Sequence, residues 1–273
     1  TGAVDPATGQ APVKASLTER KHRTVKGGVD YKTDEGPGAN LGWEHRNLFG
    51  GGEKLAVAGS ASSIEQFGEA AFEKPDALTP KDLFKAKARV ANEDKKAYKG
   101  QNATATATLR RQFTESVSGG VGLGYRASRI EKDESRPWES DARYGFVFLP
   151  VELGYDGRDD VLDPQKGLLA TASLAPYWGT LSGADNFLRP EFTLAHYLKI
   201  LEKPGLVLAT RAVGGANIGT DSENVTPDLR WYAGGSGSIR GYSYQSVGPM
   251  RGKTPVGGAS LFTFSAELRW RVT

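Results

Sequence analysis

Apolar and polar residues alternate along most of this chain. In 103–110, alanine or leucine at the odd positions alternates with threonine, or finally arginine, at the even ones. Segment 261–272 repeats the pattern: Phe262, Phe264 and Trp270 share one face, and charged and hydroxyl residues share the other. Strict alternation indicates β-strands with one apolar and one polar side. These segments reach about 10 residues, the length that a tilted strand needs to cross a membrane.

Turn residues between these segments divide the chain into about twelve predicted strands. The predicted strands span 24–33, 38–47, 54–65, 66–73, 82–95, 100–113, 117–130, 143–156, 167–179, 186–201, 206–218 and 259–272. The connections 114–116 and 202–205 are tight, whereas 131–142 and 219–258 are long. Short turns at one end and long loops at the other are typical of bacterial outer-membrane barrels, whose short turns are periplasmic. The predicted fold is therefore all-β, a transmembrane antiparallel β-barrel.

Composition narrows the class of protein further. The 273 residues include no cysteine, which excludes a disulfide framework and a cysteine metal site. The net charge of +3 is spread among interspersed charges, so no basic block indicates a nucleic-acid partner. The start of the chain, Thr1 to Asp5, lacks the basic and apolar regions of a signal peptide, and we therefore expect a mature or excised segment.

Four motifs follow one another in a characteristic order. They are Trp-Glu-His-Arg-Asn-Leu-Phe-Gly-Gly-Gly at 43–52, Leu-Pro-Val-Glu-Leu-Gly-Tyr-Asp at 149–156, Leu-Asp-Pro-Gln-Lys-Gly at 162–167 and Ile-Arg-Gly-Tyr at 239–242. With these motifs, residues 20–273 resemble the outer-membrane protein assembly superfamily, also known as the bacterial surface antigen family. Within it the chain is most similar to the TamA branch, the outer-membrane subunits of translocation and assembly modules.

The resemblance implies a domain organisation. Members have a sixteen-stranded barrel that follows periplasmic polypeptide-transport-associated (POTRA) domains. By that comparison, residues 1–22 are the end of a POTRA domain, including its last strand, and residues 23–273 are barrel strands 1–12. The last four strands of the barrel would then be missing from this sequence.

The resemblance also implies a function without bond chemistry. The protein would be an assembly and translocation factor in the outer membrane of a Gram-negative bacterium, not an enzyme, and would need no cofactor. It would help to insert or secrete β-barrel clients such as autotransporters. The implied partners are outer-membrane lipid, unfolded β-barrel or autotransporter clients and an inner-membrane-anchored TamB-like protein. The alternatives are a BamA-type assembly subunit or a two-partner secretion pore, and conductance with and without the 219–258 loop would identify a pore.

The resemblance assigns a role to the lumenal loop motif Ile239, Arg240, Gly241 and Tyr242. The loop would fold back into the barrel lumen, where Arg240 would pair with an inward carboxylate. Glu267, on the polar face of the last predicted strand, is the candidate partner. A lumenal guanidinium–carboxylate pair would be bidentate and would brace the loop. The alternative is a solvated loop arginine.

The first predicted strand carries Gly27 and Gly28. Glycine weakens strand pairing. In the superfamily the first strand meets the last at a weak seam, so one interpretation is a gate strand at which client strands add to the sheet. The other interpretation is a bulge or a bend in the strand.

Other candidate chemistry is better explained by structure. The glycine-rich loop lacks the Lys-Ser/Thr ending of a phosphate-binding loop. Four aspartates cluster at 156–163 without calcium-loop spacing, which favours a turn with an Asp156–Arg158 pair. The histidines, His22, His45 and His196, are far apart, and no motif marks a nucleophile. We therefore expect no metal site and no catalytic residues.

Overall fold

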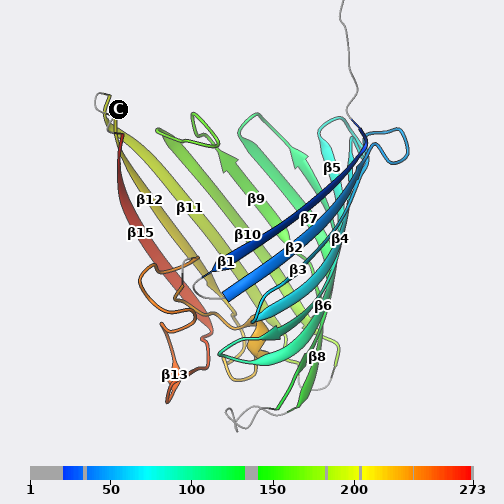
Figure 1. The fold of residues 1–273 in the computed structure, drawn as a ribbon, viewed down its shortest axis with the longest axis vertical. Helices are drawn as coiled ribbons and strands as arrows, with labels where there is room; N and C mark the ends of the chain where they lie inside the picture. The colour runs from blue at the N-terminus through cyan, green and yellow to red at the C-terminus, as the bar shows by residue number, and fades with distance from the viewer. Residues whose placement is uncertain are drawn as a thin grey trace, which may run out of the picture.

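The computed structural model describes residues 21–32, 36–132, 141–181, 184–202, 205–235 and 237–271. In these ranges thirteen strands form one antiparallel sheet that curves into a wall (Figure 1). They are β1 (Arg23–Lys32), β2 (Gly36–Arg46), β3 (Lys54–Ala61), β4 (Glu65–Pro75), β5 (Asp82–Asp94), β6 (Lys99–Gln112), β7 (Val117–Ile130), β8 (Ala142–Phe148), β9 (Val151–Asp156), β10 (Gly167–Gly179), β11 (Phe187–Leu201), β12 (Leu206–Ala216) and β15 (Ser260–Trp270). The all-β prediction is confirmed, and no helix among the described residues is long and apolar enough to span a membrane.

One predicted strand, 143–156, is divided in the structure into β8 and β9. The interruption falls at Leu149 and Pro150, because proline has no N–H to donate to a neighbouring strand. Both pieces still lie between β7 and β10. Together they occupy one strand position in the sheet, so the sheet has twelve strand positions in the predicted order.

The sheet has one apolar and one polar face. The register aligns Val90, Ala103 and Ala127 across β5, β6 and β7 on the apolar face. On the opposite face β4 and β5 exchange ion pairs, including Glu73–Lys85 at 2.7 Å and Glu69–Lys87 at 2.9 Å. Exposed apolar side chains on a barrel wall face lipid, and the polar face lines the lumen.

Connections of different length leave the two ends of the sheet. The end where the described chain begins and ends, at the top of Figure 1, carries the short connection 113–116 and the longer 157–166. The opposite end carries the tight turns 62–64 and 95–98, and also 131–141, 180–186 and the longest connection, 217–259. This last connection contains a 3₁₀ turn, η1 (Pro227–Leu229), and a small hairpin of β13 (Met250–Arg251) and β14 (Thr254–Pro255). We call the end that carries the longest connection the loop end.

The sheet has two edges, β1 and β15. Among the described strands, β1 pairs only with β2, and β15 pairs only with β12. The segment assigned to a POTRA domain, 1–22, lies outside the described residues except for its last two positions.

Candidate functional site

The connection 217–259, which we call the lumenal loop, folds back onto the polar face of the sheet. Its anchor is Asp228, in η1, whose side chain is only 1% exposed. Arg126 of β7 donates to one carboxylate oxygen of Asp228 from Nε at 3.0 Å and from Nη2 at 2.6 Å. Ser128 donates to the same oxygen, and the Thr226 hydroxyl donates to the other. Every donor satisfies a charge that would otherwise be buried unpaired.

This environment keeps Asp228 ionised. Burial by itself would raise the pKa of Asp228, but Arg126 and the hydroxyl groups of Ser128 and Thr226 outweigh burial and hold the pKa below its ordinary value. A depressed pKa contributes stability above the unfolded-state pKa of about 3.9, and that stability is lost as the pH falls through the folded-state value. The loop anchor is therefore intact throughout the neutral range.

Apolar residues on either side of Asp228 reinforce the anchor. Val225 and Leu229 are buried in a cluster with aromatic residues of β8, β10 and β11. Its aromatic members are Phe146, Phe148, Tyr177 and Phe187. Tyr177 stacks on Phe148 and on Phe187, with ring centroids 4.8 Å and 4.7 Å apart. These contacts provide the loop with a small hydrophobic core inside the lumen.

A second arginine fixes the backbone at the end of η1. Arg189 of β11 donates from Nη1 to the carbonyl oxygen of Leu229 at 2.7 Å and to Oδ1 of Asn217 at 3.0 Å. Its guanidinium lies 4.2 Å from the ring centroid of Trp231. The indole also lies so close to Gly215 of β12 that an added Cβ there would approach it within 2.2 Å. Only glycine at this position leaves room for Trp231.

The pair expected from the sequence, Arg240 and Glu267, is in contact. Arg240 Nη1 lies 2.7 Å from Glu267 Oε1, but the side chains are 79% and 37% exposed. Glu267 lies on the polar, lumenal face as expected, but the contact is a single one and not bidentate, and Glu267 is also 3.4 Å from Arg269. Solvent screens such a pair, so Arg240 is a weaker anchor than Asp228.

The other residues of the motif form a turn around Arg240. The amide of Gly235 donates to the carbonyl oxygen of Tyr242 at 2.9 Å, and Gly235 forms an isolated β-bridge with Ile239. Gly241 has a φ of +86°, which favours glycine. The Tyr242 side chain is exposed. The motif therefore presents Arg240 at the surface of the lumenal loop.

Asp228 is not among the site residues predicted from the sequence. It stands in Thr226-Pro227-Asp228, which reads as an ordinary turn. The available signal was Arg126, at an inward position of a predicted strand. A buried inward arginine needs an acidic partner elsewhere in the fold. The alternating pattern of the neighbouring strands does not identify which acidic residue that is.

Arg240→Ala is expected to have a small effect. We expect a loss of at most about 1 kcal/mol of barrel stability, because the pair is exposed. The measurement is the temperature at which the folded barrel loses its compact gel mobility, and the double variant Arg240→Glu, Glu267→Arg should restore part of any loss. A destabilisation of several kcal/mol would show that the motif is the main anchor after all.

The predicted gate strand is regular. Gly27 and Gly28 pair with Leu41 and Asn40 in a register that continues without a shift along the whole of β1. The structure therefore contains no bulge at these glycines. An added Cβ at Gly27 would lie at an ordinary 3.7 Å from Leu41, so packing does not require glycine there.

The free edge of β1 offers chemistry of its own. No described strand covers it, so backbone N–H and C=O groups along it are available to another strand. Such an edge can bind an extended peptide by adding it to the sheet. Val29, near the loop end of β1, is 87% exposed on the apolar side.

The remaining candidates are structural. Arg158 binds Asp156 through two N–H groups at 2.8 Å and 2.7 Å, which confirms the predicted pair. Asp159 accepts backbone N–H groups of Gln165 and Lys166, so it closes the 157–166 turn. The part of the chain that the structure describes contains no group of three or more acidic, histidine or cysteine residues able to hold a metal ion.

Known proteins share this architecture. The family model described as the Omp85 superfamily domain matches residues 47–273. The outer membrane protein assembly factor BamA of Nitratidesulfovibrio vulgaris is 26% identical over 271 residues, covering 96% of this chain and 34% of that protein. A SAM50-like protein of Schizosaccharomyces pombe is 32% identical over 115 residues, covering 41% of this chain and 24% of that protein.

A solved structure agrees on the fold. The crystal structure of BamA from Haemophilus ducreyi lacking POTRA domains 1–3 superposes with a TM-score of 0.79 at 21% identity, covering 92% of this chain and 53% of that one. This chain thus spans about a third of the length of the BamA relative and about half of the solved chain.

Proposed function

The chain belongs to the Omp85 superfamily, and from that membership we propose that it is an assembly factor that helps unfolded β-barrel clients to enter the outer membrane. It is an outer-membrane β-barrel protein, like its bacterial relatives. Relatives that are named assembly factors support a role that makes and breaks no covalent bonds. The observation that carries the proposal is the match of the Omp85 superfamily domain to residues 47–273.

The proposed mechanism is templating by hydrogen bonds. A client strand in lipid has backbone groups that water cannot reach, and each unsatisfied group costs several kcal/mol, on the order of the desolvation penalty. The edge of β1 would pair with these groups and start the client sheet. Gly27 and Gly28 make β1 less rigid than a strand rich in β-branched residues, and we propose that this lets the edge exchange one partner strand for another.

Disulfide cross-linking tests the proposed edge directly, because the chain has no cysteine of its own. We expect a cysteine placed at Lys26 or Asp30 in β1 to cross-link with a client strand at every second client position, since side chains of a paired strand alternate between faces. The matched control is Thr106→Cys, on the same face of β6, which has a neighbour on both sides. Equal cross-linking at Thr106, or assembly of the client without any cross-link to β1, would overturn the proposal.

A finer proposal concerns the branch. We propose a TamA-type role with autotransporter clients and a TamB-like partner, supported by the sequence of 243–249 after the Arg240 motif. A BamA-type subunit is the second candidate, supported by the relatives named BamA. Co-purification from cells separates the two. An inner-membrane-anchored TamB-like protein in the purified sample supports the first. Other assembly subunits in the sample, without a TamB-like protein, support the second.

The domain organisation is also proposed. We propose that residues 1–22 end a POTRA domain and that further barrel strands continue the sheet beyond β15 in the native protein. The share of the relatives' length that this chain spans supports this organisation. A permanently open pore is less consistent with the lumenal loop, since η1 is anchored by buried contacts inside the wall.

A further inference from the structure

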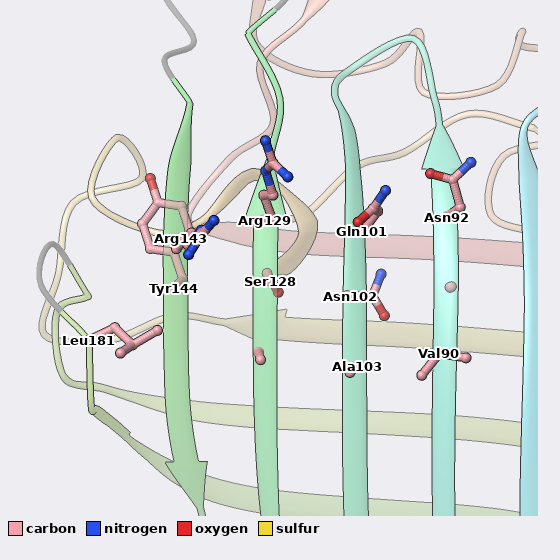
Figure 2. A pocket seen from close by; sticks show the side chains of 12 residues that line it. Val90, Asn92, Gln101, Asn102, Ala103, Ser128, Arg129, Arg143, Tyr144 and Leu181 are labelled. Atoms are coloured by element: carbon pink, nitrogen blue, oxygen red, sulfur yellow. The ribbon is translucent and has the colours of Figure 1, made fainter.

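A shallow groove of about 500 Å³ runs along the outer, apolar face of the sheet near the loop end. Figure 2 shows its polar upper row, in which Arg143, Arg129, Gln101 and Asn92 follow one another across neighbouring strands. The register confirms that this row is continuous from β8 through β7 and β6 to β5. Side chains in it point away from the lumen, because they share a face with the apolar residues below them.

The two arginines are an unusual pair. Arg129 and Arg143 stand directly opposite each other on β7 and β8. Like charges at opposed positions of an antiparallel pair destabilise the sheet. Among the described residues neither arginine forms an ion pair. The nearest described acids, Glu131 and Asp141, lie two residues away along the chain, and Asp141 accepts the backbone N–H of Lys132. An anion between them would remove the repulsion and accept two guanidinium groups at once.

Small residues form the floor below the arginines. Val90, Ala103 and Ala127 make up the next row towards the middle of the wall. A second groove of about 490 Å³ shares these residues and continues downwards past Ala88 and Ala105. The side chains of both grooves are mainly apolar and short, so together they leave a shallow depression along the strands.

We propose that this surface binds an anionic lipid of the leaflet at the loop end. Its phosphate would lie between Arg129 and Arg143, and its acyl chain would lie along the groove of small residues. The positive charge of the two arginines is complementary to a negatively charged phosphate. The groove below them lies on the side of the wall that faces lipid. Gln101 and Asn92 supply further hydrogen bonds to the headgroup region. This site lies on the outer wall, apart from the lumenal loop and from the edge of β1.

The test uses lipid binding to the folded chain in detergent, followed by native mass spectrometry. The probe is dimyristoyl phosphatidic acid, and dimyristoyl phosphatidylcholine is the lipid control with the same chains but no net charge. We expect the wild type to retain the anionic lipid preferentially. The double variant Arg129→Gln, Arg143→Gln should weaken that retention by about tenfold or more, as expected for the loss of two charge-assisted contacts.

Two further variants make the result specific. Arg251→Gln with Lys253→Gln removes two cations from the same end, but from the lumenal loop, and should leave retention unchanged. Ala103→Phe should fill the groove and weaken retention of the lipid several-fold while the arginines remain. Folded gel mobility verifies each variant.

The outcomes decide the proposal. Equal retention of both lipids, or unchanged retention by the double arginine variant, would overturn it. Displacement of the lipid by a modest excess of inorganic phosphate, with no effect of Ala103→Phe, would also overturn it, since the surface would then be a simple anion site without a chain groove.

Discussion

Replacing Asp228 by alanine is expected to release the lumenal loop from the barrel wall. The variant leaves Arg126 without its carboxylate in a site where that side chain is only 18% exposed. Removing one partner of a buried ion pair typically costs about 3–5 kcal/mol. We expect the anchor to fail, because the hydroxyl groups of Ser128 and Thr226 also lose their acceptor.

Trypsin provides the measurement for this variant. The lumenal loop contains Arg230, Arg240, Arg251 and Lys253, so a released loop should be cut while the strands keep their compact gel mobility. The matched control is Glu223→Ala in the same loop, whose side chain is 80% exposed and pairs only at 3.2 Å with Arg251. Resistance to trypsin in Asp228→Ala equal to that of the control would show that the anchor lies elsewhere.

Replacing Phe146 by alanine is expected to be the most destabilising change in the strands. Phe146 is 0% exposed and contacts Tyr177 and Phe187 edge to face, with centroids 5.9 Å and 5.6 Å away. Removing a buried phenylalanine side chain costs about 3–5 kcal/mol, because the cavity that remains collapses only in part. The loss should fall on the strands and on the loop together, since the same cluster contains Val225 and Leu229.

The control for Phe146 is a phenylalanine on the other face. Phe262 of β15 is 67% exposed on the apolar side, where lipid can fill the space that alanine leaves. The temperature at which the folded barrel loses its compact gel mobility should therefore fall strongly for Phe146→Ala and little for Phe262→Ala. Equal shifts would mean that the lumenal cluster contributes no more than ordinary wall contacts.

Much of the fold follows from the sequence because a membrane strand must meet two simple requirements, on its length and on its alternation. A tilted strand must be about 10 residues long and must alternate between lipid and lumen. Segment 103–110 shows both properties, and it lies within β6 as expected. The break between β8 and β9 could also have been predicted from the sequence, because Pro150 lacks the N–H that an unbroken strand needs.

The contacts of the lumenal loop did not follow from the sequence. Pairing between neighbouring strands is local, so alternation and turns determine it. The contact of Asp228 with Arg126 joins residues 102 positions apart, and no periodic pattern specifies where a loop of irregular backbone will lie. The Arg240–Glu267 contact was anticipated from the resemblance, but its exposure was not.

The sequence by itself determined the strands, their order, their two faces and the superfamily, because each rests on a repeat that is readable within about 10 residues. The tertiary structure decided which carboxylate holds the loop, that β1 is regular at Gly27 and Gly28, and that Arg129 and Arg143 face each other on the outer wall. These features depend on burial and on register across strands, and both exist only once the sheet has formed.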